Sequence, residues 1–250
     1  MRRTALLTAT VVAWFGMACA AASTTHQAAT VPQHRLFESL QTIALDPICA
    51  CGLPADLRGI DLGRGKFDSL ITAELSNAGY RLVPAAESQA IWDRLADSLG
   101  GLFNAASGEI DSVRLHSVRA RTLQELRERF HADAWLHPVI VFARADFKSG
   151  TAKWDGTKQT FGQKFLGINL ESGYGTTPAL SLDVIIETTD GKVQFEWKGG
   201  LQLFQVPSDN GFVRIPDSQV YADQERNVAA VRLALAPLLV GMAAATAASK

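Results

Sequence analysis

The chain has 250 residues, of which 47% are hydrophobic and 20% charged, and its formal net charge is −1. These values are typical of a globular protein with room for one large or two small domains and a real hydrophobic core. They exclude an intrinsically disordered chain, and the near-neutral balance lacks the basic surface that nucleic-acid binding requires. We therefore expect no nucleic-acid partner.

The first 22 residues have the pattern of an export signal. Arg2 and Arg3 give a positive start, an apolar run extends from Ala5 to Met17, and small residues follow over 18–22. This order is that of a secretory signal peptide, which is removed from the mature protein. The sequence therefore predicts an exported bacterial protein, located in the periplasm or associated with the outer membrane.

The small residues at the end of this signal leave two processing routes open. Cleavage after Ala20 or Ala22 would release a soluble protein. In the alternative route, Cys19 is the lipid-modified residue of a lipoprotein, although Gly16 occupies the position at which that signal carries leucine. We expect membrane association only if Cys19 is lipidated, and one acyl chain alone would anchor the protein weakly.

Beyond the signal, residues 23–39 are small and polar and predict a mobile leader. A single α/β domain is expected over 40–240, followed by a mobile tail over 241–250. The domain opens with a short apolar strand at Thr42–Leu45, which the turn signal Asp46-Pro47 ends.

Cys49 and Cys51 are the two cysteines that remain after the signal. A disulfide between residues two apart would be strained and easily reduced, so one interpretation is a thiol-redox pair. Two alternatives stay open: two small residues at the end of a buried strand, or a metal site completed by a later histidine. Because no second ligand pair occurs at a recognised zinc spacing, we expect no metal.

The first half of the domain alternates strands and helices. A capping-box pattern at Thr122–Glu125 predicts that a helix begins there. Periodicity and stop signals predict the other elements in chain order: a helix at 66–77, a strand at 80–83, a helix at 87–99 and a strong strand at 132–142. This alternation predicts a sheet with crossover helices.

The segment 148–178 is rich in glycine and has little periodicity, so we expect a long loop, with room for a small hairpin at the turn Trp154-Asp155-Gly156. A tryptophan beside such a turn is a candidate contact residue for a partner. The alternative is that Trp154 folds back as part of the core.

Two alternating segments then predict a β-hairpin around the turn Asp190-Gly191, with Gly199-Gly200 permitting a bulge. Its expected buried face consists of Leu182, Val184, Ile186, Val193, Phe195 and Trp197. A C-terminal helix follows, capped by Asp217 or Ser218. The predicted fold class is therefore α/β, with a mixed β-sheet and crossover helices in the first half and an antiparallel hairpin plus a C-terminal helix in the second.

No pattern in the chain has the specificity of a catalytic signature. A Gly-x-Ser-x-Gly elbow and a glycine-rich phosphate cradle before a helix are both absent from the sequence, so we expect no catalytic residue and no cofactor. His131 and His137 flank the strong strand, where a histidine is more often structural than catalytic. The enzyme alternative is a hydrolase or thiol-redox site near Cys49, Cys51, His131 and His137.

Four short motifs resemble the amino-terminal-TolB-like and curli-secretion-channel group of envelope proteins, which includes small lipoproteins. They are the opening strand with Asp46-Pro47, the helix-to-strand step over 75–84, the strand entry at 131–136, and the hairpin 182–193 with Trp197. The resemblance implies an envelope domain that acts through protein or surface contacts without a cofactor. Because amphipathic pore-forming hairpins are not visible, a secretion channel is disfavoured. We thus expect a non-catalytic accessory or assembly protein with an envelope protein as partner, and with oligomerisation left open.

Overall fold

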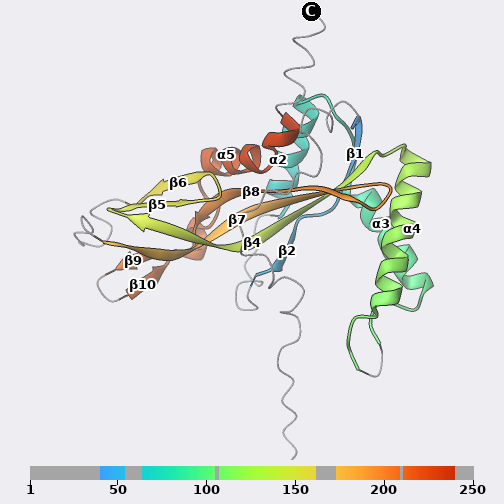
Figure 1. Cartoon of the computed structure of the whole chain (residues 1–250), viewed down its shortest axis with the longest axis horizontal. Helices are drawn as coiled ribbons and strands as arrows, with labels where there is room; N and C mark the ends of the chain where they lie inside the picture. Colours follow the sequence, from blue (N-terminus) through green and yellow to red (C-terminus); the bar gives the residue numbers. More distant parts are fainter. Residues whose placement is uncertain (1–39, 54–63, 105–106, 162–172, 209–210, 240–250) are drawn as a thin grey trace, which may run out of the picture.

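The computed structural model describes residues 40–53, 64–104, 107–161, 173–208 and 211–239 (Figure 1). The expected signal with Cys19, the leader and the tail lie outside these ranges. Within them, no helix is both long and apolar enough to span a membrane. The elements follow one another as β1 (Thr42–Leu45), β2 (Cys49–Gly52), α2 (Arg64–Asn77), β3 (Arg81–Val83), α3 (Ala85–Ser98), α4 (Ser112–Phe130), β4 (Ala134–Lys148), β5 (Thr151–Trp154), β6 (Thr157–Thr160), β7 (Tyr174–Thr188), β8 (Val193–Leu203), β9 (Gln205–Ser208), β10 (Gly211–Arg214), the 3₁₀ turn η2 (Asp217–Gln219) and α5 (Gln224–Ala234).

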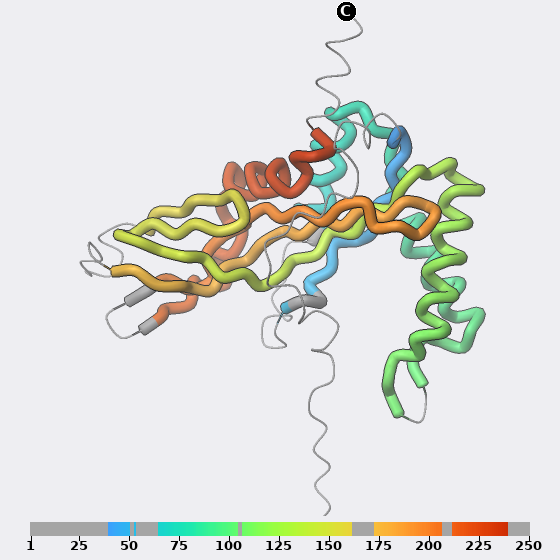
Figure 2. The backbone as a smooth tube through the Cα atoms, viewed as in Figure 1, coloured from blue at the N-terminus to red at the C-terminus, as the bar shows by residue number. Residues whose placement is uncertain are grey.

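The predicted fold class is confirmed, because one mixed sheet carries both kinds of strand pairing. Its parallel part has the order β3-β1-β4, and β2 adds to β4 beyond the end of β1. Its antiparallel part joins β4 to β7 and β7 to β8. Figure 2 shows β4 and β7 running side by side along their whole length.

Helices cover both faces of the sheet near its parallel end. Apolar residues of α2 and α5, such as Phe67 and Val231, pack in one core cluster with Leu136 and Val184. On the opposite face, α3 and α4 pack in a second cluster around Trp135. The β-strand period of two sends alternate residues to the two clusters, so β1 places Ile43 in the first and Ala44 in the second.

At the far end of the sheet a third apolar cluster includes Ala152, Phe161 and Leu203. The strands around this cluster correct the expectation of a long loop. Residues 148–178 contain β5, β6 and the start of β7, and the small hairpin turns at Asp155-Gly156. Side chains of β6 reach β8: Thr157 Oγ1 donates to Gly200 O at 2.8 Å, and Leu203 N donates to Gln159 Oε1 at 3.0 Å. The sheet therefore curls over this cluster.

Two helix starts differ from the sequence-based expectation. Helix α4 begins at Ser112, and its cap is Asp111, which accepts hydrogen bonds from the backbone of Val113 and Arg114. Thr122 lies within this helix and donates its hydroxyl to Val118 O, so the capping-box prediction is wrong. The last helix is capped by Asp223, while Asp217 begins the separate turn η2.

The predicted β7–β8 hairpin is confirmed with one exception. Leu182, Val184, Ile186 and Phe195 are buried, and Trp197 is partly buried against the same cluster. Val193 is 50% exposed. The β7–β8 register shifts at this point, so Val193 lies opposite Glu187 and no longer belongs to the buried face of the hairpin.

Gly199 permits the close approach of α5 to β8. A Cβ atom at this position would lie 2.1 Å from the backbone oxygen of Ala230. We expect Gly199→Ala to lower the free energy of unfolding by about 1–3 kcal/mol, since the helix must move away from the sheet. Gly65→Ala is the matched control, because its Cβ would meet nothing within 4 Å. Urea titrations of both variants test this, and an equal stability of the two would contradict the packing described.

Candidate functional site: an ion-pair network at the edge of the parallel strands

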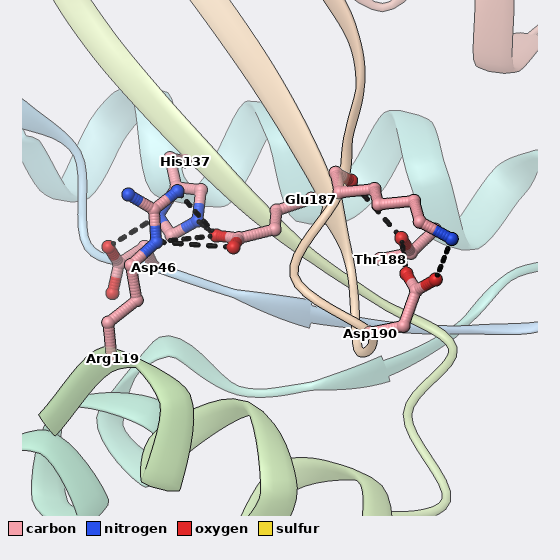
Figure 3. A network of polar contacts seen from close by, with 7 residues as sticks. Asp46, Arg119, His137, Glu187, Thr188 and Asp190 are labelled. Atoms are coloured by element: carbon pink, nitrogen blue, oxygen red, sulfur yellow. Dashed lines mark hydrogen bonds and ion pairs between the residues drawn. The ribbon is translucent and has the colours of Figure 1, made fainter. Parts of the chain in front are cut away.

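Four residues that are distant in sequence meet where β1 ends (Figure 3). Asp46 follows β1, His137 lies on β4, Glu187 lies on β7 and Arg119 projects from α4. The β1–β4 register places Leu45 opposite Leu136, so Asp46 and His137 come next to each other. In the β4–β7 register Glu187 lies opposite Trp135, diagonal to His137 on the same face.

The contacts form a continuous chain of opposite charges. Nδ1 of His137 lies 3.0 Å from Asp46 Oδ2 and donates to it, and Nε2 of His137 lies 3.5 Å from Glu187 Oε2. The guanidinium of Arg119 donates from Nη2 to Glu187 Oε2 at 2.7 Å and from Nε at 2.9 Å. Glu187 is only 2% exposed, so its charge depends on these partners.

The surroundings shift the pKa values of His137 and Glu187 in opposite directions. Burial by itself lowers the pKa of His137, but the hydrogen bond to Asp46 and the negative charges of Asp46 and Glu187 outweigh it, and the pKa lies above its ordinary value. Burial by itself raises the pKa of Glu187, but His137 and Arg119 outweigh it, and the pKa lies below its ordinary value. Both shifts favour the charged pair.

A second buried carboxylate lies on the same face of β7. Asp183 Oδ2 is 3.3 Å from Lys198 Nζ on β8, and its Oδ1 has no hydrogen-bond partner. Burial raises the pKa of Asp183 to about 7, although Lys198 acts against this. Here burial dominates, whereas at Glu187 the positive partners dominate.

The network is arranged for structure more than for proton transfer. A general base needs one ring nitrogen facing a reacting group. In His137 both ring nitrogens face carboxylates, and the ring packs 4.3 Å from that of Trp135. Across the described ranges, no group of three or more His, Cys, Asp or Glu side chains is placed to hold a metal ion.

The other residues of the enzyme alternative lie on different elements: His131 ends α4, and Cys49 on β2 lies opposite Val139, two residues along β4 from His137. His131 is exposed and ends α4 in a left-handed backbone conformation, with φ 54°. Asp133 accepts from the backbone of Gln41 and Thr42 at 2.8 and 2.9 Å, which is a structural role. Cys49 is disulfide-bonded, and the side chain of Cys51 lies outside the described part of the chain.

Trp154 is a core residue rather than an exposed contact, which corrects the contact interpretation. It is 6% exposed, packs in the third cluster, and donates from Nε1 to Leu180 O at 3.2 Å. The Asp155-Gly156 turn folds it back because Gly200 N donates to Asp155 O at 3.1 Å. A Cβ atom at Gly200 would lie 2.6 Å from Trp154 Nε1, so the glycine makes room for the indole.

Sequence reasoning found His137 but missed its partners. In the sequence, Asp46 is part of a turn signal, and Arg119 and Glu187 belong to no motif. Glu187 gave no signal either, because it is out of phase with the expected buried face of Leu182, Val184 and Ile186, and the alternation therefore predicts that it faces solvent.

Comparison with known proteins identifies neither a family nor a function. No protein-family model matches the sequence. No curated protein matches it either. Among solved structures, the chain is similar to the crystal structure of lipoprotein GNA1162 from Neisseria meningitidis, with 18% sequence identity and a TM-score of 0.33. The match covers 65% of this chain and 82% of that one. The resemblance to the amino-terminal-TolB-like and curli group stays a prediction.

The pKa shifts predict a pH window for the network. Because the folded pKa of His137 is raised, its contribution to stability is present below about pH 6.5 and lost as pH rises through the folded pKa. Because the folded pKa of Glu187 is lowered, its contribution is present above about pH 4.5 and lost as pH falls through the folded pKa. The free energy of unfolding of wild type minus that of His137→Gln should therefore shrink on moving to alkaline pH.

Urea titrations across this range measure that difference. Asp183 also destabilises the fold as pH rises toward its raised pKa, but it is present in both proteins and cancels in the comparison. A difference that grows with pH would contradict a protonated His137.

The burial of Trp154 predicts a large loss on truncation. Trp154→Ala should lower the free energy of unfolding by about 3–5 kcal/mol. Trp154→Phe keeps an aromatic ring but removes the donor to Leu180 O, and should cost less, with about 1 kcal/mol of its loss due to the hydrogen bond. Chemical denaturation measures both variants. An unchanged denaturation midpoint for the alanine variant would contradict the burial of Trp154.

Proposed function

We propose that the chain is a non-catalytic accessory or assembly protein of the bacterial cell envelope that acts by binding another envelope protein. The export pattern of its first 22 residues supports the location. The hydrogen bonds and ion pairs that His137 and Asp133 make within the protein support a structural role for these two residues.

The observation that carries the proposal is an apolar tip on the connection between α3 and α4, which we define as Phe103, Ile110 and Val113. These side chains are 51%, 47% and 77% exposed. In Figure 2 this connection lies at the end of the α3–α4 pair that points away from the sheet. Exposed apolar side chains that cluster within a short segment mark interaction sites.

The tip is held in one shape by its own hydrogen bonds. Phe103 and Ile110 form an antiparallel bridge, so their side chains lie on the same side of it. Asp111 N donates to Leu102 O at 2.8 Å on one flank of this bridge, and Asn104 N donates to Glu109 O at 2.8 Å on the other. A rigid apolar surface loses little conformational entropy when a partner covers it.

A photo-crosslinking amino acid placed at position 113 tests this function in the native envelope. We expect a discrete adduct with one envelope protein, identified by mass spectrometry, whose yield falls several-fold when Phe103 is replaced by Asp. The same crosslinker at position 193 is the matched control, because Val193 is 50% exposed in a different region. Phe103→Asp should leave the free energy of unfolding within about 0.5 kcal/mol of wild type.

Two outcomes would contradict the proposal. Equal adducts from positions 113 and 193 would show that the tip has no special affinity for a partner. An adduct at 113 that persists in a folded Phe103→Asp protein would show that the apolar side chains do not carry the contact.

A further inference from the structure

Strand β8 forms one edge of the sheet, because among the described strands it pairs with β7 alone. The β5–β6 hairpin meets one end of its outer side. Gly200 N donates to Asp155 O at 3.1 Å, and Thr157 Oγ1 donates to Gly200 O at 2.8 Å. Both backbone groups of Gly200 therefore point away from β7. At the other end, the register shift at Val193 interrupts the regular edge.

The register shows which other backbone groups of β8 point outward. Residues of an antiparallel pair alternate between positions that bond to the neighbouring strand and positions that face away from it. The β7–β8 register is continuous from Phe195 to Gly200, so Glu196 and Lys198 share the direction of Gly200. Their N–H and C=O groups make no hydrogen bond within the described part of the chain. This stretch of backbone is therefore open to a further strand.

The two faces of this edge differ in chemistry, and both offer surface to a partner. Glu196 and Lys198 lie on the face of Asp183, and their side chains are 46% and 32% exposed. Trp197 lies on the opposite face, where it is only partly buried against the cluster that includes α5. An added strand would thus meet charged side chains on one face and an indole ring on the other.

On the charged face, one lysine serves two carboxylates. Nζ of Lys198 lies 3.3 Å from Asp183 Oδ2 and 3.4 Å from Glu196 Oε1. Asp183 is 5% exposed, and its Oδ1 has no hydrogen-bond partner. A second cation beside Glu196 would leave Lys198 to Asp183, so the charges of the edge favour a basic residue on the incoming strand.

A second copy of β8 fits this edge poorly. A two-fold antiparallel pair centred on Glu196 would place two glutamates opposite each other, which is unfavourable. Centred one residue earlier, the pair would place Lys192 opposite Lys198. Centred one residue later, it would bring the second strand opposite Gly200, whose backbone groups already bond to the β5–β6 hairpin. The arrangement therefore favours a different chain.

We propose that the outer edge of β8 binds an extended segment of another protein as an added antiparallel strand, with a lysine or arginine opposite Glu196 and an apolar residue opposite Trp197. In an antiparallel pair Glu196 exchanges both of its backbone hydrogen bonds with one residue, whose side chain then lies beside its own. The backbone supplies affinity and the two side chains supply selectivity. This edge is separate from the apolar tip and ends before Val193, so the proposal does not depend on the proposed function.

Amide hydrogen exchange, followed by NMR on the full chain, tests the edge itself. In the free protein the amides of Glu196 and Lys198 should exchange about tenfold or more faster than those of Phe195 and Trp197, which bond to β7. Slow exchange at Glu196 and Lys198 in the free protein would overturn the proposal, because the edge would already be occupied. Protection that grows with protein concentration would overturn it in favour of a second copy.

Three peptides test the added strand. The probe is acetyl-Thr-Val-Lys-Val-Thr-amide, whose central lysine would lie opposite Glu196. It should slow exchange at Glu196 and Lys198 saturably. The same peptide with glutamate at its centre should bind about fivefold more weakly, the effect expected for one cross-strand charge pair. Methylation of the central lysine's backbone nitrogen removes its donor to Glu196 O and should abolish the protection.

Two variants of Glu196 separate the backbone contact from the charge. Glu196→Pro removes an N–H that has no partner, so the fold should tolerate it, but the edge should no longer bind the probe. Glu196→Gln is the matched control: it keeps the backbone, so binding should persist while the preference for lysine over glutamate disappears. Equal affinity of wild type for the two peptides, or undiminished binding in a folded Glu196→Pro protein, would overturn the proposal. If Glu196→Pro does not fold, the methylated peptide decides.

Discussion

The pairing of β4 with β7 is the constraint on which the rest of the structure depends. The two strands pair over fifteen residues each, from Ala134 opposite Thr188 to Lys148 opposite Tyr174. At one end β4 also carries the parallel strands, and at the other it carries β5. Since a shift of one residue would exchange the two faces of a strand, this register decides which side chains meet each helix layer. It also places Glu187 beside His137 rather than in an apolar cluster.

The buried carboxylates on β7 then impose their own requirements. Glu187 sits under α4, and removing Arg119 alone would leave its charge without its closest positive partner, which costs more than the pair contributes. The network therefore acts mainly on specificity: it fixes where α4 lies on the sheet and, through α4, where the tip points. At Asp183, Lys198 lowers the pKa of the carboxyl group by less than burial raises it.

Elements with a complete local signal were predictable, and those with a partial signal were not. The β7–β8 hairpin has alternating apolar residues and the turn Asp190-Gly191, so both strands were found. Strands β5 and β6 are short and mostly polar, and their pairing stabilises them more than their composition does. The first turns of α4 bury only Val118, so helical periodicity there is too weak to show that the cap is Asp111, eleven residues before Thr122. The ion-pair network was harder to predict. Arg119 and Asp46 contact residues that are 68 and 91 positions away in the sequence, so these contacts can be predicted only once the strand order is known.

The contacts run without a gap from Asp46 at the end of β1 through His137 and Glu187 to Arg119 on α4. Continuity alone is not coupling. The physical element that links the end of β1 to α4 is the proton on His137, because Asp46 on one side and Glu187 on the other both raise the pKa of that ring. Glu187 in turn pairs with Arg119, so the charge on His137 acts on the contact that holds α4 to the sheet.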